Sequence, residues 1–287
     1  MIPWSRMENC PARKVWRHNW TSRVRRYSEA HLIVVSIPKS GRTWLRVFLH
    51  AYFCALEKRE FTLRSRDLFT GNVPKFIFTH DLWGYLAARR LKDRITGRPL
   101  IPPLQSRHKR ILLLSRDPRD VIVSLFFQYT KRINRYQGDL HELIHHPKFG
   151  IMRIVNVMNA WMAEWGERPE FKVLRYEDCQ RRTEEEFRGM LTFLGCREID
   201  DEALARGMEF SSFENMRAIE AGEQVKYNLL QPGNVQDPDS YKVRRGRVGG
   251  FLEYVESADL PYLEQVLARL DERFGYKSRD SLRRQVG

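Results

Sequence analysis

The amino-acid sequence predicts an α/β fold of three layers, with a central parallel sheet between two layers of helices. Short apolar runs typical of buried strands alternate along the chain with longer segments of helical periodicity. Polar residues then follow the strand-like runs, since Lys39, His80, Arg116 and Tyr176 each come just after one. Because ligands of open parallel sheets bind beyond the carboxyl ends of the strands, these residues predict one binding site there.

The elements follow from local pattern and from helix signals. Pro118 suits the first turn of a helix because its φ is already helical, and Gly195 is a typical helix stop. The stretch 96–106 is rich in Gly and Pro, which predicts a loop. The expected strands are residues 32–36, 76–79, 111–115 and 171–175, and the expected helices are residues 43–56, 119–135, 152–166 and 183–194.

Composition indicates a folded, soluble protein. The 287 residues are 42% hydrophobic and 30% charged, and no run of 18 apolar residues predicts a membrane span. The N-terminus lacks the apolar segment of a secretory signal, and the four cysteines show no zinc-like or paired spacing. We therefore expect reduced thiols and a cytoplasmic location. The expected organisation is a basic arm over 1–30, a single domain over 31–276 and a basic tail over 277–287.

The net charge of +14 is concentrated in residues 1–30, 89–110 and 273–287. Such segments can attract an acidic surface, nucleic acid or anionic lipid, although most basic stretches are simply solvated surface. Trp16 and Trp20 lie at helical spacing in the arm, which could make a peripheral membrane contact. Nucleic acid is the less favoured partner, because an excess of positive charge does not by itself identify a binding partner.

The turn between residues 36 and 44 predicts an anion site. A strand, a tight turn holding Pro38, Lys39 and Gly41, and then a helix would direct backbone N–H groups at a phosphate or sulfate. Gly41 allows close approach of the backbone, and Lys39 adds a flexible positive charge. The turn is not a Walker A loop, because residues 31–38 contain no glycine.

A second motif begins at Arg116. A guanidinium can bind a phosphate bidentately, and the hydroxyl of Ser124, eight residues on, can add one directional hydrogen bond. Asp117 and Asp120 are expected to balance the helix dipole, with Arg119 exposed. His80, at the end of another strand, is the candidate general base, because an imidazole can take a proton near neutral pH.

These motifs, in this order, resemble those of the sulfotransferases that use 3′-phosphoadenosine 5′-phosphosulfate (PAPS). The likeness runs from about residue 31 to residue 250 and is most specific at the turn, at Arg116–Ser124 and at 244–246. It implies a sulfotransferase fold with a P-loop-like phosphate loop and sulfuryl transfer to a hydroxyl or amine of a small-molecule acceptor. The catalytic residues it implies are His80, Lys39 and Ser124. The residues it implies for the donor are Lys39, Ser40, Gly41, Arg42, Thr43, Trp44, Arg116, Ser124, Tyr176, Ser211, Phe213, Arg244, Arg245 and Gly246.

The chain departs from the family pattern at two places near the sulfate. Arg42 stands where cytosolic animal members commonly have threonine, and Phe78 stands where the family has a lysine two residues before its histidine. The dimerisation segment of animal members is not recognisable after Gly250, so no oligomeric state is expected from it. Aromatic residues expected to line the acceptor site are Trp83, Tyr85, Phe127 and Tyr129, with Tyr136 close by.

Residues 141–145 match the H-E-x-x-H zinc pattern, with Glu142 in the place of the base. Pro147 is expected to end the helix two residues after His145, and Ile151 stands where the longer zinc-protease pattern has its third histidine. We therefore expect no metal here. The transfer reaction needs none either, because lysine, arginines and a helix end supply positive charge.

Two other functions remain open on the sequence. A nucleotide kinase or other phosphotransferase of related architecture would show Mg²⁺ dependence. A basic protein that binds nucleic acid or a membrane surface would show steep salt dependence and would tolerate loss of Lys39 or His80.

Overall fold

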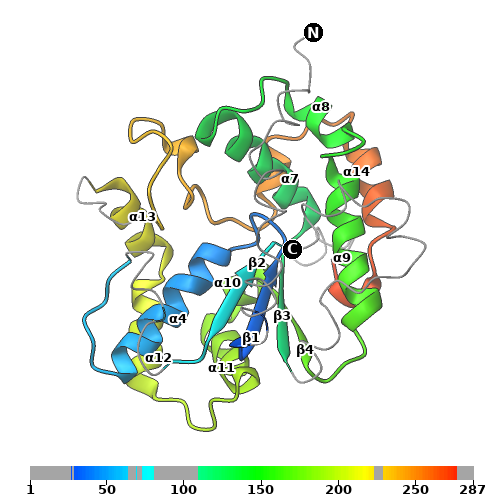
Figure 1. The fold of residues 1–287 in the computed structure, drawn as a ribbon. Coiled ribbons are helices and arrows are strands. Elements are labelled where there is room, and N and C mark those ends of the chain that lie inside the picture. The colour runs from blue at the N-terminus through cyan, green and yellow to red at the C-terminus, as the bar shows by residue number, and fades with distance from the viewer. Residues whose placement is uncertain are drawn as a thin grey trace, which may run out of the picture.

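The computed structural model describes residues 27, 29–63, 69, 73–80, 109–222 and 229–276 (Figure 1). The predicted arm, apart from a few residues at its end, lies outside the described residues, as do Trp83 and Tyr85. The same holds for the basic segment 89–110 except its last two residues and for the tail 277–287.

A parallel sheet of four strands forms the centre of the described fold. The strands are β1 (Leu32–Ser36), β2 (Phe76–Thr79), β3 (Arg110–Ser115) and β4 (Phe171–Arg175), in the spatial order β2-β1-β3-β4. Ile33 is in register with Ile77 on one side and with Ile111 on the other, and Leu113 pairs with Val173. All four predicted strands are confirmed, with β3 one residue longer than expected.

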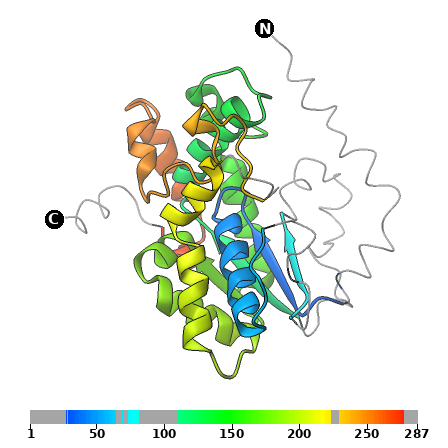
Figure 2. The ribbon, with the colours of Figure 1, turned by 90° about the vertical axis from the view of Figure 1, so that its left-hand side faces the viewer.

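Alternate residues of the strands enter two separate cores. Ile33, Val35 and Leu113 belong to one core, whereas Val34 and Leu112 belong to the other. Because side chains alternate across a strand, strands that are apolar throughout must be covered on both faces. Helices indeed lie on either side of the sheet (Figures 1 and 2), so the predicted three-layer α/β class is confirmed.

The helices divide between the two faces. One face packs on α4 (Arg42–Leu56), α11 (Thr183–Leu194) and α12 (Asp201–Phe210), and the other packs on α7 (Pro118–Phe127), α8 (Leu140–His145), α9 (Ile151–Trp165) and α14 (Leu260–Leu267). The remaining helical elements are α10 (Tyr176–Arg181), α13 (Phe213–Ala221), a π-helix η1 (Gln128–Arg132), and the 3₁₀ turns η2 (Pro238–Ser240), η3 (Gly250–Glu253) and η4 (Glu272–Phe274). No helix in these described parts is long and apolar enough to cross a bilayer.

The segment predicted as one helix over 119–135 differs from expectation. Its α-helical part ends at Phe127, and the chain continues as the π-helix η1. The Thr130 hydroxyl donates to the carbonyl of Phe126 at 2.9 Å, a local side-chain bond that competes with the regular ladder. Such π-turns are frequent at functional sites.

The expectation for Arg119 was wrong. Its side chain is fully buried, where it pairs with Asp117 at 2.7 Å and with Glu264 of α14 at 2.8 Å. Its guanidinium also lies 4.7 Å from the ring centroid of Phe251. Arg119 therefore joins α7 to α14, because a buried cation requires carboxylate partners.

Candidate functional site

The site lies beyond the carboxyl ends of β1 and β3. These strands are neighbours, but the chain leaves β1 towards β2 on one side of it and leaves β3 towards β4 on the other. Such a reversal opens a crevice between the two loops. A pocket of about 790 Å³ occupies this place, within the usual size range of small-molecule sites.

The pocket gathers most of the residues predicted for the donor and the reaction. Those that line it are Lys39, Gly41, Arg42, Thr43, Trp44, His80, Arg116, Ser124, Tyr129, Tyr176, Ser211, Phe213, Arg244, Arg245 and Gly246. They come from segments up to about 200 residues apart in sequence, so their convergence is a property of the fold.

The loop after β1 has the backbone that an anion site requires. Lys39 and Gly41 have φ of 70° and 87°, so the chain turns through the left-handed region twice within three residues. A Cβ on Gly41 would lie 2.8 Å from the ring of Tyr176, so only glycine fits this approach. Gly41 is also the N-cap of α4, which has no acidic residue in its first turn. Its N-terminal N–H groups and its dipole therefore face the pocket uncompensated.

Lys39 sits among other cations. Burial, together with the charges of Arg132, Arg116 and Lys242, lowers the pKa of Lys39 to about 7. Its ammonium donates to the Gln128 Oε1 at 3.2 Å. An anion bound next to this lysine would restore its charge, so the site is poised to take up a negative ligand.

One buried carboxylate organises the neighbouring cations. Glu220 is fully buried and accepts the backbone N–H groups of Lys242 and Val243 at 2.7 and 2.8 Å, with Arg132 at 3.6 Å. Burial and the charge of Arg132 lower the pKa of Lys242 to about 8. These contacts fix the segment before Arg244 against α13.

Arg116 lies where the loops after β1 and β3 meet. Its guanidinium donates to the carbonyl of Lys39 at 3.3 Å and to that of Arg247 at 2.9 Å, and lies 4.4 Å from the ring centroid of Tyr176. Asp120, one helical turn on, is 3.6 Å from the same guanidinium. The Arg116 guanidinium is thus held at the pocket wall in a fixed orientation, by hydrogen bonds at its edge and by the tyrosine ring at its face.

Asp120 also attaches the segment 244–251 to α7. Its two oxygens accept the backbone N–H groups of Gly249 and Phe251, each at 2.9 Å. Burial raises the pKa of this carboxyl. Arg244 donates to the Tyr254 hydroxyl at 2.7 Å, while Arg245 pairs with Glu253 and is exposed. The segment therefore covers the pocket from the C-terminal part of the chain.

Three aromatic rings border the pocket on the side of α4. Trp44 and Tyr176 are in edge-to-face contact with centroids 5.7 Å apart. Phe213 lies beside Gly246, whose φ is 63° and whose added Cβ would be 2.6 Å from that ring. The rings and the buried Ser211 form a surface suited to a flat heterocycle, because aromatic pairs stack or meet edge to face.

His80 is oriented by the end of β1. Its Nδ1 lies 2.8 Å from the carbonyl oxygen of Ser36 and 3.1 Å from the hydroxyl of the same residue. A carbonyl can only accept, so Nδ1 carries the hydrogen and Nε2 carries the lone pair. That tautomer is the one able to accept a proton at Nε2.

Some predicted residues do not line the pocket. Phe127 is nearly buried and packs beneath Arg244, whose guanidinium is 3.9 Å from its centroid. Tyr136 is buried in the core on the α7 side of the sheet and donates its hydroxyl to Asp139. Ser40 is fully buried under the loop. Of the four expected acceptor residues, Tyr129 alone is both described and at the pocket.

Other pocket residues were missed from the sequence. Gln128 lies four residues after Ser124 and Asp120 four residues after Arg116, so helical spacing could have indicated both. Lys242 also lines the pocket, but it gave no signal because its place depends on Glu220.

A buried donor at the pocket fits an anionic ligand. Arg116 lines the pocket, and its Nε has no hydrogen-bond partner within the described part of the chain. Buried polar atoms are nearly always satisfied, so orphaned donors beside a cationic turn are expected where a ligand completes them.

The parallel sheet is covered by helices on both faces, and a cationic turn lies where the connections from β1 and β3 run in opposite directions. These features define an α/β protein that binds a phosphate- or sulfate-bearing ligand. The sequence-family model of the sulfotransferase domain matches residues 29–275 of the chain. The protein therefore belongs to the sulfotransferase family, and the resemblance drawn from its motifs is confirmed.

Individual relatives are distant. Cytosolic sulfotransferase 12 of Arabidopsis thaliana is 23% identical over 86% of this chain and 78% of its own length. Sulfotransferase 1E1 of Bos taurus is 22% identical over 82% and 83%. Mouse sulfotransferase SULT7A1, solved with PAP, has a TM-score of 0.58 at 18% identity, covering 83% of each chain. Retinol dehydratase, solved with androsterone and PAP, has a TM-score of 0.54 at 18% identity over 83% and 79%. These likenesses confirm the fold.

Proposed function

We propose that the protein transfers the sulfuryl group of PAPS to a hydroxyl or amine of a small-molecule acceptor. The observation that carries the proposal is the convergence of Lys39, His80, Arg116 and the segment 244–246 on one pocket. Family membership supports sulfuryl transfer. The donor, the acceptor and the residue roles below are our proposal.

Each end of the donor has a matching part of the pocket. The 5′-phosphosulfate would lie on the turn of residues 39–43 at the N-terminus of α4, where N–H groups, Lys39 and Arg42 meet it. The 3′-phosphate would contact Arg116, Ser124 and the segment 244–246. The adenine would lie against Trp44, Tyr176 and Phe213, near Ser211. Retinol dehydratase and SULT7A1 were solved with PAP, which supports the same class of donor.

The reaction would be an in-line displacement at sulfur. An acceptor oxygen or nitrogen forms a bond to sulfur while the bond from sulfur to the 5′-phosphate oxygen breaks. The acceptor proton passes to Nε2 of His80, and the electron pair of the broken bond goes to the leaving phosphate oxygen. Lys39 stabilises that oxygen, an electrostatic effect that commonly contributes a hundredfold to a thousandfold in rate. Ser124 completes the catalytic set by fixing the donor.

The acceptor would enter beside His80. Gln128 and Tyr129 border the pocket near Lys39, and Trp83 and Tyr85 follow His80 in sequence. Androsterone and retinol, bound by retinol dehydratase, are apolar alcohols, and aromatic residues here would suit such molecules. A cytoplasmic location and a peripheral contact of the basic arm remain predictions.

A thermal-shift titration of the full chain would test the donor site. Adenosine 3′,5′-bisphosphate (PAP) is compared with ATP plus Mg²⁺, because a ligand that binds the native state raises its unfolding temperature. We expect stabilisation by PAP that is lost in Arg116→Ala and retained in Arg197→Ala, an exposed arginine outside the pocket.

The outcomes separate the alternatives. Stabilisation by ATP–Mg²⁺ alone would favour a kinase, and the absence of any shift would favour a binding role of the basic segments. With PAP binding established, transfer of labelled sulfate from PAPS to a panel of phenols, alcohols and amines tests the reaction.

A further inference from the structure

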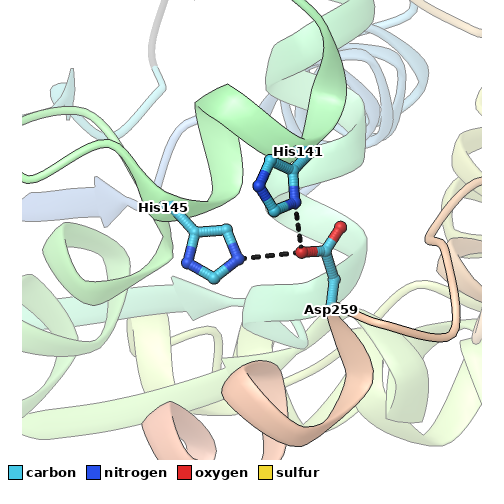
Figure 3. A group of neighbouring side chains, drawn as sticks. All are labelled: His141, His145 and Asp259. Atoms are coloured by element: carbon cyan, nitrogen blue, oxygen red, sulfur yellow. Dashed lines mark hydrogen bonds and ion pairs between the residues drawn. The ribbon is translucent and has the colours of Figure 1, made fainter.

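A second cluster of side chains lies away from the pocket, where α8 meets the start of α14. His141 and His145, one helical turn apart on α8, both point at Asp259 (Figure 3). None of the three lines the donor pocket. Asp259 lies more than a hundred residues further along the chain, so the sequence pattern gave no sign of it.

The three side chains converge on one point. His141 Nδ1 is 2.7 Å and His145 Nε2 is 2.8 Å from the same oxygen of Asp259. One ligand atom from each residue lies within 4.8 Å of the other two. The His145 ring is held by stacking on Tyr262, with centroids 4.1 Å apart.

The Asp259 side chain is directed at the histidines instead of serving as a helix cap. It occupies the N-cap position of α14 but makes no capping hydrogen bond. Among the described elements, the five other aspartates at N-cap positions do bond a backbone N–H, namely Asp117, Asp139, Asp200, Asp237 and Asp271. Asp259 therefore forgoes the usual stabilisation of a helix N-cap.

The charge of Asp259 also needs a partner. Its side chain is 2% exposed, and among the described residues its ion-pair partners are these two histidines. The two imidazoles satisfy one oxygen of this carboxylate by hydrogen bonds and carry no permanent charge. A divalent cation bound by the three side chains would balance the charge of the carboxylate.

We propose that His141, His145 and Asp259 form a binding site for a divalent transition metal of the zinc type. Two imidazoles four residues apart on a helix plus a carboxylate form a donor set that Zn²⁺ and Co²⁺ accept. The His141 and His145 side chains are 57% and 36% exposed, so the metal can enter and water can fill its fourth position. The bound metal joins α8 to α14.

Metal binding would require only a small movement of the two imidazole rings. Tetrahedral zinc with ligand bonds near 2.1 Å sets neighbouring ligand atoms about 3.4 Å apart, so each of the two nitrogens would move roughly 0.7 Å from the Asp259 oxygen. Both rings are at the surface, at the end of a helix that His146 terminates in an extended conformation. Without metal, the same atoms form a hydrogen-bonded triad, which is the competing interpretation.

Co²⁺ titration of untagged, chelator-treated full-length protein tests the site, because protein-bound Co²⁺ has visible absorption bands. We expect saturation at one equivalent, competition by Zn²⁺, and at least tenfold weaker binding in His141→Ala. Glu142→Gln is the matched control. It changes the middle of the zinc-like pattern, but Glu142 faces Tyr136 and not the cluster, so binding should be unchanged. Asp259→Asn should weaken binding as His141→Ala does.

The thermal unfolding transition of each variant, measured without ligand, shows whether the domain is folded. This control does not depend on PAP binding, so a failure of the donor proposal would leave the Co²⁺ result unaffected. The proposal is overturned if the wild-type protein shows no stoichiometric binding, or if folded His141→Ala binds Co²⁺ as tightly as the wild type.

Discussion

Lys39 donates to Gln128 across 3.2 Å, so the turn after β1 is linked to the π-helix that continues α7. The lysine backbone is in the left-handed region and its ammonium lies among cations. The contact gives this charge a neutral acceptor in place of a carboxylate. The lysine therefore stays available to an anionic donor, because an amide binds an ammonium less strongly than a carboxylate does.

Lys39→Met should lower kcat about a hundredfold to a thousandfold, because the leaving phosphate loses its nearest cation. The same change should raise the unfolding temperature without ligand, since it removes a charge that burial and neighbouring cations disfavour. Steady-state kinetics and calorimetry measure the two effects. Lys131→Met, at an exposed position of the π-helix η1, should change neither kcat nor the unfolding temperature. Equal activity of the two variants would contradict the role of Lys39.

Binding of PAP should depend on pH through Lys39. Its pKa of about 7 in the folded protein means that the ammonium is largely charged below pH 7 and must take up a proton on binding above it. The affinity should therefore be flat below pH 7 and fall by up to about tenfold per unit above it. Calorimetric titrations between pH 6 and 9 measure this. Lys39→Arg, which stays protonated, should flatten the curve, leaving the later contribution of Lys242 near pH 8.

His80→Gln should lower kcat by about a hundredfold to ten-thousandfold while leaving the affinity for PAP within twofold of the wild type. The reason is that the imidazole would accept a proton from the acceptor and would not hold the nucleotide. Single-turnover sulfate transfer and PAP titration measure the two quantities. His31→Gln, which changes an exposed histidine just before β1, is the control. If PAP binding fell together with the rate, the histidine would be a donor residue instead.

Gly246→Ala should weaken PAP binding far more than Gly249→Ala. Both residues have positive φ, 63° and 73°, so the backbone strain of an alanine is similar. An added Cβ at Gly246 would meet Phe213 at 2.6 Å, whereas nothing lies within 4 Å at Gly249. The difference between the variants therefore isolates the contact between segment 244–246 and the ring. Equal losses would place the effect in the backbone and not in this contact.

Much of the fold could be predicted from local sequence pattern, and most of the residues that the family resemblance implied for the donor do line the pocket. Apolar runs of four residues identified β1 and β3, because a strand buried on both faces shows no polar alternation. Gly195 predicted the end of a helix because glycine readily adopts the left-handed conformation of a C-cap. In the structure α11 ends at Leu194, and the φ of Gly195 is 98°. The polar residues after each strand marked one end of the sheet, because parallel strands share a carboxyl edge.

By itself, then, the sequence determined the order of strands and helices, the tight turn between β1 and α4 and the family, since each depends on neighbours along the chain. Only the tertiary structure decided the burial of Arg119, the contact of Gln128 with Lys39, and the meeting of His141 and His145 with Asp259. These contacts join segments up to about 145 residues apart. They depend on how helices pack on the sheet, which no local pattern of residues specifies.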